Sequence, residues 1–139
     1  ETEKNFEELL DFVREIKFNK MGCFPYSREE GTPAFNMPGQ IPEKVKEKRC
    51  QKLMSVQEKI AEDYGKAMIG KTVEVLTEGF DNESGLWFGR SKADAPDIDG
   101  KGFFYKDLVR HDDLRGKFIY AKIKEYEDYN LIGEFLEEV

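Results

Sequence analysis

The sequence predicts an α+β chain, in which a helix and a short buried strand precede a long helix and a small five-stranded antiparallel barrel of OB-like size. Three observations indicate this order. Apolar residues recur every three or four positions near the start, and strong helix formers fill positions 43–67. From Lys71 onward apolar and polar residues alternate between frequent turn signals. Such a change of period is typical of a helical segment followed by a sheet.

The first predicted helix covers Asn5–Ile16. Its apolar residues share one face at helical spacing: Phe6, Leu9, Leu10, Phe12, Val13 and Ile16. The apolar run from Phe18 to Phe24 follows and predicts a buried strand. A helix leading into a strand is half of an α/β repeat, which cannot close a core by itself. We therefore expect residues 1–41 to be the end of a larger barrel, in a chain that starts at Glu1 and is a piece of a longer protein.

The second predicted helix, residues 42–69, links the two halves of the chain. It follows a Gly- and Pro-rich loop, Ser27–Pro42, whose prolines limit its freedom. Pro42 suits the first turn of a helix, and Gly70 suits the position after its end. One apolar stripe runs along this helix: Val45, Leu53, Val56, Ile60, Tyr64 and Met68. Arg49 interrupts that stripe.

The barrel is expected over residues 70–139. Five short runs have the residue types of strands: Val73–Val75, Leu86–Phe88, Phe103–Tyr105, Phe118–Ile123 and Leu131–Leu136. Turn-forming residues separate them: 81–85, Asp99-Gly100, Arg115-Gly116 and 128–130. About five short strands with tight connections predict a small closed barrel.

Composition limits the classes of function. The 18 aromatic residues argue against a disordered chain, and no apolar run approaches the roughly 20 residues that cross a bilayer. We expect a cytoplasmic monomer without membrane contact. Cys23 and Cys50 lie far apart, and His111 is the single histidine, so we expect free thiols, no metal site and no catalytic residue. Asp94–Gly100 resembles a calcium loop only in part, because the later Glu ligand is missing.

The predicted barrel suits two kinds of partner. Trp87, Phe88 and Phe103, with Arg90 nearby, offer a surface on which nucleic-acid bases could stack, although alternate members of these runs equally suit the barrel core. Residues 70–139 carry 10 Lys and Arg against 16 Asp and Glu, a net charge of −6. That sign is wrong for phosphates and favours a basic protein partner. RNA stays open as a disfavoured alternative.

Several stretches resemble the C-terminal end of the radical-SAM methylthiotransferases. Phe24–Ala34 reads F-P-Y-S-R-E-E-G-T-P-A, similar to the family's F-x-Y-S-x-E-E-G-T-x-A run. Arg49–Ile60 is similar to its R-x-x-x-L-M-x-x-Q-x-x-I helix, and Gly70–Leu76 to the opening of its TRAM domain. The resemblance implies that residues 1–41 end a partial TIM-like radical-SAM barrel, that 42–69 form a linking helix, and that 70–139 form a TRAM domain.

Gly89–Gly100 points to one branch of that family. It reads G-R-S-K-A-D-A-P-D-I-D-G, similar to the G-R-S-x-x-D-A-P-E-I-D-G signature of the RimO type, and Asp97 replaces the signature Glu. Asn130 likewise replaces the second Asp of the branch's usual D-Y-D-L. The resemblance implies an enzyme that methylthiolates an aspartate of ribosomal protein S-twelve. The tRNA-modifying branch has a different pattern here, so an RNA-binding TRAM module is the alternative.

The resemblance also implies cofactors and site residues. The family uses two four-iron four-sulfur clusters and S-adenosylmethionine, but this chain lacks the cysteine motifs that hold the clusters, so it should be inactive alone. Residues expected at the S-adenosylmethionine or substrate cleft are Tyr26, Ser27, Glu29, Glu30, Gly31 and Thr32. Residues expected at the protein partner are Trp87, Arg90, Asp94, Asp97, Asp99 and Phe103.

Overall fold

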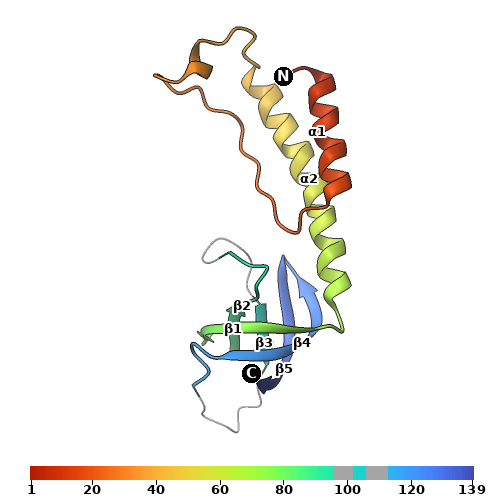
Figure 1. Cartoon of the computed structure of the whole chain (residues 1–139), viewed down its shortest axis with the longest axis vertical. Helices are drawn as coiled ribbons and strands as arrows, with labels where there is room; N and C mark the ends of the chain where they lie inside the picture. Colours follow the sequence, from red (N-terminus) through yellow and green to blue (C-terminus); the bar gives the residue numbers. More distant parts are fainter. Residues whose placement is uncertain (96–101, 106–112) are drawn as a thin grey trace. The chain divides into compact units, whose positions relative to one another are not determined.

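The structure is a computed structural model that describes residues 1–95, 102–105 and 113–139. By its internal contacts the chain divides into two compact units, residues 1–61 and residues 62–139. Unit 1 contains α1 (Glu3–Ile16), the 3-10 helix η1 (Pro33–Asn36) and most of α2 (Glu43–Met68). Unit 2 contains the end of α2 and the strands (Figure 1).

Helix α1 begins at a capping box and buries one stripe of side chains. The Thr2 hydroxyl accepts a hydrogen bond from the Asn5 backbone N–H at 3.2 Å, and the Asn5 side chain accepts from the Thr2 backbone N–H at 2.9 Å. Phe6, Leu10 and Val13 pack with Leu53 of α2 to form the core of unit 1. The outer members of the predicted apolar stripe, Leu9, Phe12 and Ile16, stay exposed.

Residues 18–24, predicted to form a buried strand, are extended but form no strand. A strand requires hydrogen bonds to a neighbouring strand, and no described strand pairs with this segment. Its apolar residues still reach the core of unit 1, because Phe18, Met21 and Cys23 pack against that core. The segment is therefore held by a helix instead of a sheet.

Helix α2 starts directly after Pro42 and ends before Gly70, which adopts a left-handed φ of +85°. The predicted linking helix is thus present. Arg49 forms an ion pair with Glu3, and Lys52 with Glu7, so the residue numbers on both helices rise together. Helices α1 and α2 therefore run parallel. Residues 18–32 run back from the C-terminal end of α1 toward the N-terminal end of α2, as Figure 1 shows.

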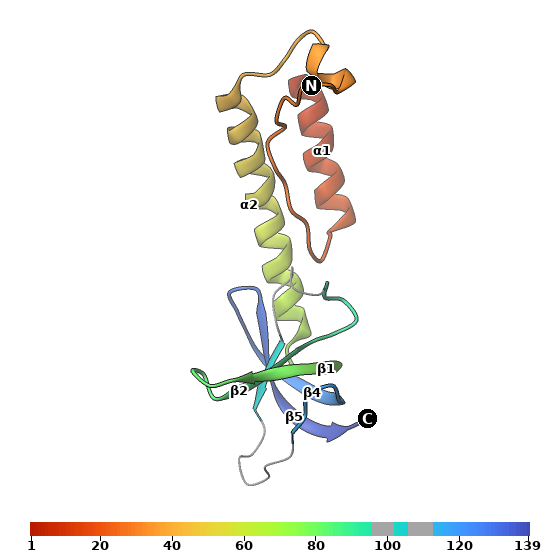
Figure 2. The ribbon, with the colours of Figure 1, turned by 90° about the vertical axis from the view of Figure 1, so that its left-hand side faces the viewer.

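Five strands in the described residues of unit 2 close into a barrel in the order β1-β2-β3-β5-β4. They are β1 (Thr72–Asp81), β2 (Leu86–Arg90), β3 (Gly102–Tyr105), β4 (Phe118–Glu127) and β5 (Asn130–Glu138) (Figure 2). The prediction of a fully antiparallel barrel is wrong, because β3 and β5 run parallel. The reason is geometric: in a closed ring of five strands, direction cannot alternate at every neighbour.

The interior of the barrel is filled by apolar side chains from several strands. Buried residues form its core: Val75, Phe104, Leu114, Ile119 and Ala121. Trp87 and Phe135 pack against this core. Gly89 allows β1 and β2 to approach closely, since a Cβ there would lie 2.2 Å from the Leu76 carbonyl oxygen. The core is thus small and tightly packed.

The end of α2 packs on β4 through Gly65 and Tyr126, both within unit 2. A Cβ built on Gly65 would lie 2.2 Å from Cδ2 of the Tyr126 ring. The ring covers the helix backbone at this point, and burial is the main cause that raises the pKa of Tyr126. Any side chain at position 65 would have to displace the ring.

Replacing Gly65 by Ala should therefore destabilise unit 2 by about 1–3 kcal/mol, the usual range for overpacking. At an exposed helix position the same change stabilises by about 1 kcal/mol. The sign of the change in unfolding free energy therefore shows whether the Tyr126 ring occupies this space. Urea denaturation of G65A measures the effect. The control is G65A combined with Tyr126→Leu, in which the ring that meets the added methyl group is removed. A G65A variant more stable than the parent chain would refute this packing.

Candidate functional site

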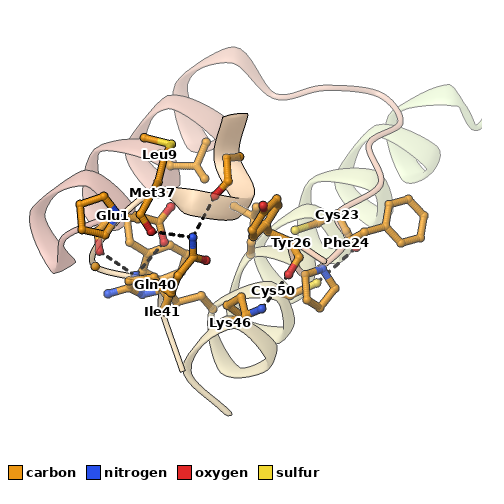
Figure 3. A pocket seen from close by; sticks show the side chains of 17 residues that line it. Glu1, Leu9, Cys23, Phe24, Tyr26, Met37, Gln40, Ile41, Lys46 and Cys50 are labelled. Carbon is orange, nitrogen blue, oxygen red and sulfur yellow. Dashed lines mark hydrogen bonds and ion pairs between the residues drawn. The ribbon is translucent and has the colours of Figure 1, made fainter. Parts of the chain in front are cut away.

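Unit 1 contains a cavity of about 450 Å³ between α1, α2 and the segment that joins them (Figure 3). Its apolar wall includes side chains from all three parts: Phe6, Leu9, Phe24, Met37, Ile41 and Leu53. Polar groups reach the same cavity from Tyr26, Lys46 and Arg49. An apolar cavity of this volume with a few polar groups has the character of a small-molecule site.

Arg49 is the charged residue that connects the two helices at this cavity. Its side chain is only 13% exposed and forms ion pairs with Glu1 at 2.7 Å and with Glu3 at 2.8 Å. The guanidinium also lies over the Phe6 ring, with 5.4 Å between its Cζ and the ring centre. This is within the limit of about 6 Å for a cation–π contact. Its Nε is buried and has no hydrogen-bond partner in the described part of the chain. In the sequence, Arg49 stood out as an interruption of the apolar stripe and as the first residue of the R-x-x-x-L-M motif.

Three side chains of α2 hold the extended segment by its backbone carbonyls. Gln57 Nε2 donates to the Phe18 oxygen at 2.7 Å, and Lys46 Nζ donates to the Tyr26 oxygen at 2.7 Å. Between them, the Cys50 thiol donates to the Cys23 oxygen at 3.2 Å. Because these donors lie on one face of α2, they fix the course of residues 18–26 along the helix. Sequence reasoning missed this row.

The residues predicted at the cofactor cleft divide into two groups. Tyr26 lines the cavity, and Lys46 Nζ lies 5.7 Å from the centre of its ring. The other five residues form an exposed turn beyond it. Within that turn Ser27 donates to the Glu29 carboxylate at 2.8 Å, and Thr32 donates to the Glu29 carbonyl at 2.7 Å. Gly31 has a φ of +79°, which the turn requires. A role in cofactor binding stays a prediction.

Two further residues of this region escaped the sequence prediction. Arg28 Nε donates to the Phe35 carbonyl at 2.7 Å, and its guanidinium lies 4.5 Å from the centre of the Phe35 ring. Gln40 donates to the Ala34 and Met37 carbonyls, each at 3.0 Å. Together these side chains hold the 28–40 loop in one course. Nothing in the local sequence pattern distinguishes them from solvated polar residues.

In the barrel, the predicted aromatic residues lie on opposite faces. Trp87 packs on the core and contacts Phe80 edge-on, with 5.3 Å between ring centres. Phe88 and Phe103 are cross-strand partners with ring centres 6.3 Å apart. Neighbouring residues of a strand point to opposite sides, so Phe88 and Phe103 face outward while Trp87 and the buried Phe104 face inward. Phe88 and Phe103 are therefore the half-buried members of the outward face, on which Tyr105 at the end of β3 is exposed.

The charged residues predicted to meet a partner have local contacts of their own. Arg90 Nε lies 3.3 Å from the Glu78 carboxylate across β1 and β2. The Asp94 carboxylate accepts from the Ser91 backbone N–H at 2.7 Å and from the Ser91 hydroxyl at 2.8 Å, which closes the turn after β2. Asp97 and Asp99 lie outside the described residues. The structure thus gives Asp94 a role in holding the turn.

Within residues 1–95, 102–105 and 113–139, no group of three or more His, Cys, Asp or Glu side chains is placed to hold a metal ion. None of the helices described is both long and apolar enough to cross a bilayer.

Known proteins share both units of this chain. Residues 69–136 match the family model of the TRAM domain. A protein of Carboxydothermus hydrogenoformans named ribosomal protein uS12 methylthiotransferase RimO is 45% identical over 138 residues, which are 99% of this chain and 31% of that protein. The chain carries a TRAM domain and resembles the C-terminal part of the RimO methylthiotransferases. The resemblance predicted from the motifs is thereby confirmed.

Two more relatives with the same name show a similar extent of match. The protein of Thermoanaerobacter sp. is 44% identical over 97% of this chain, and that of Clostridium acetobutylicum is 44% identical over 96%. These matches cover 30% and 29% of the two relatives. The chain therefore spans about three tenths of the length of the curated RimO relatives that it matches.

The Glu3–Arg49 pair gives a pH dependence with a defined sign. The hydrogen bond from Arg49 lowers the pKa of Glu3 below its ordinary value of 4.5. The stabilisation is therefore fully present above pH 4.5 and is lost as the pH falls through the lowered pKa. At pH 7 the Leu10 and Val13 amides should exchange at different rates in the parent chain and in Glu3→Gln, and this difference should shrink as the pH falls below 4.5 through the lowered pKa of Glu3.

The control for this prediction uses the partner residue. In an Arg49→Gln background the Glu3→Gln change should lose its pH-dependent effect, because the charge that lowers the pKa is gone. A difference between parent and Glu3→Gln that does not shrink as the pH falls below 4.5 would contradict the ion pair.

Proposed function

We propose that this chain is the substrate-recognition part of an enzyme that methylthiolates an aspartate of ribosomal protein S-twelve. The observation that carries the proposal is the 45% identity, over 99% of the chain, to a protein named for that activity. The signature-like stretch 89–100 lies within the matched region. We expect this enzyme to be a cytoplasmic monomer.

The proposed organisation has three parts. Residues 1–41 would end the radical-SAM barrel, residues 42–69 would link, and residues 70–139 would form the TRAM domain. The parallel helices of unit 1, with an extended segment returning between them, support the first part, since α/β barrels repeat this arrangement. The unpaired strand-like segment 18–26 is where a neighbouring barrel strand would add.

The cofactors of such an enzyme fit this chain unequally. An iron–sulfur cluster needs clustered cysteine ligands, and the two cysteines here are too few to hold one. No step is therefore assigned to the clusters through these residues. S-adenosylmethionine fits better, because Tyr26 lines an apolar cavity whose wall also includes the positively charged Arg49. Tyr26 and the turn 27–32 would border the cofactor cleft.

The cofactors and the residues of this chain would have different roles in such an enzyme. The clusters and S-adenosylmethionine would supply the radical chemistry and the methylthio group when bound. The residues of this chain would shape one wall of the cleft and hold the protein substrate near it. We infer that the chain has no methylthiotransferase activity by itself.

Recognition of a basic protein follows from the charge of the barrel. Residues 70–139 carry a net charge of −6, whereas residues 1–69 carry −1. Complementary fields speed the encounter of oppositely charged partners and set their register. Asp94, Asp97 and Asp99 are proposed to face basic residues of ribosomal protein S-twelve, while Asp94 also closes the turn that begins at Ser91.

This assignment predicts how charge changes alter binding. Asp97→Asn combined with Asp99→Asn should weaken the affinity for an S-twelve loop peptide about three- to tenfold at low salt, the effect of losing two exposed charge pairs. The matched control, Glu125→Gln with Glu127→Gln, removes the same charge from exposed positions of β4 and should change the affinity less. Isothermal titration at two salt concentrations measures both. Equal losses in the two variants would exclude a specific role of the loop.

The alternative is an RNA-binding TRAM module, and the outward pair Phe88 and Phe103 favours it. On that alternative, Phe103→Ala would weaken binding of an anticodon stem-loop RNA by about 1–3 kcal/mol. Phe118→Ala, which truncates an exposed aromatic residue on β4, serves as the control. Trp87→Ala is unsuitable because Trp87 packs on the core. We expect no RNA affinity beyond a weak, salt-sensitive background.

A further inference from the structure

Cys23 and Cys50 are brought together by the fold although 26 residues separate them in the chain. Cys23 lies in the extended segment and Cys50 on α2, and the Cys50 thiol donates to the Cys23 carbonyl oxygen at 3.2 Å. Both side chains line the cavity of unit 1, where Figure 3 shows them next to each other. From their spacing in the sequence, we expected two free thiols.

The neighbouring contacts keep this pair in register. On one side Gln57 holds the Phe18 carbonyl at 2.7 Å, and on the other Lys46 holds the Tyr26 carbonyl at 2.7 Å. Cys23 also packs against the core that contains Leu53, which lies one helical turn after Cys50. The extended segment is therefore fixed to α2 both before and after the thiols, so the two sulfurs stay close while unit 1 is folded.

The thiols are half-buried, and the cavity gives small molecules access to them. The pKa of Cys23 is raised to about 11, first by burial, then by a hydrogen bond with the Cys50 side chain and by the charge that Cys50 carries when it is ionised. Cys23 therefore remains protonated at neutral pH.

We propose that Cys23 and Cys50 form an oxidisable dithiol, which a small peroxide converts into a disulfide that fastens the extended segment to α2. The dithiol lines the same cavity that Tyr26 lines, but its oxidation uses neither the barrel nor the 27–32 turn and does not depend on the proposed methylthiotransferase function. The cavity admits the oxidant, and the fold supplies the second thiol.

The reaction balances with hydrogen peroxide as the oxidant. The Cys50 sulfur, as thiolate, attacks one peroxide oxygen, the O–O bond breaks, and the products are a sulfenic acid and, after protonation, water. The Cys23 sulfur then attacks the Cys50 sulfur, its proton goes to the departing hydroxide, and a second water leaves. The two sulfurs lose two electrons in total, and the peroxide gains them.

The experiment uses the 139-residue chain and equimolar hydrogen peroxide. Thiol counting after denaturation should fall from two to none, and peptide mapping should find Cys23 joined to Cys50 within one chain, with a mass lower by two hydrogens. Cys23→Ser and Cys50→Ser are the matched controls, and neither can give the internal cross-link. Two thiols that persist, or cross-links only between chains, would overturn the proposal.

A second measurement separates the role of the fold from simple reactivity. In mixtures of reduced and oxidised glutathione, the equilibrium between dithiol and disulfide reports how closely the fold holds the two sulfurs. The disulfide should be favoured at least about tenfold more in the folded chain than in concentrated urea. An equilibrium that urea leaves unchanged would show that the folded contact does not promote the bond.

Discussion

The parallel pairing of β3 with β5 is the contact on which the barrel depends. Gly102–Tyr105 is only four residues long, yet it joins β2 on one side and β5 on the other, and so closes the sheet. Closure places Phe104 in the core and, by strand alternation, Phe103 on the outside. The same closure brings Gly133 of β5 beside Phe104, where the absence of a side chain leaves room near the backbone of Lys122. The core and the outward face of β3 therefore both follow from this closure.

Unit 1 depends on a different arrangement, in which a helix replaces the strands that a sheet would provide. The carbonyls at Phe18, Cys23 and Tyr26 are bound by side chains of α2 instead of neighbouring backbone. An extended segment without partners would otherwise leave its polar groups unsatisfied, which costs free energy wherever water is excluded. The arrangement leaves one side of the segment without strand pairing, which agrees with our proposal that further barrel strands adjoin it.

The alternating pattern after Lys71 predicted all five strands, because each has β-branched or aromatic residues bounded by turn residues. It could not predict the parallel pair, since strand direction follows from closure of the whole ring. Trp87 and Phe88 are indistinguishable by composition, and only their register against Phe104 and Phe103 separates inside from outside. Gly65 escaped notice because Tyr126, the residue that requires it, lies in a distant part of the sequence. Of the residues predicted at a cofactor or substrate cleft, only Tyr26 lines the cavity, because the others form the exposed turn beyond it.

The central claim is that the acidic barrel binds a basic protein, and chemical-shift mapping of the labelled chain tests it most directly. One titration would use a peptide from the S-twelve loop and the other an anticodon stem-loop RNA, both in modest salt. We expect shifts with the peptide, centred on residues 90–100, and little change with the RNA. Shifts with the RNA alone, centred on Phe88 and Phe103, would contradict the charge argument and place the chain with tRNA-modifying enzymes.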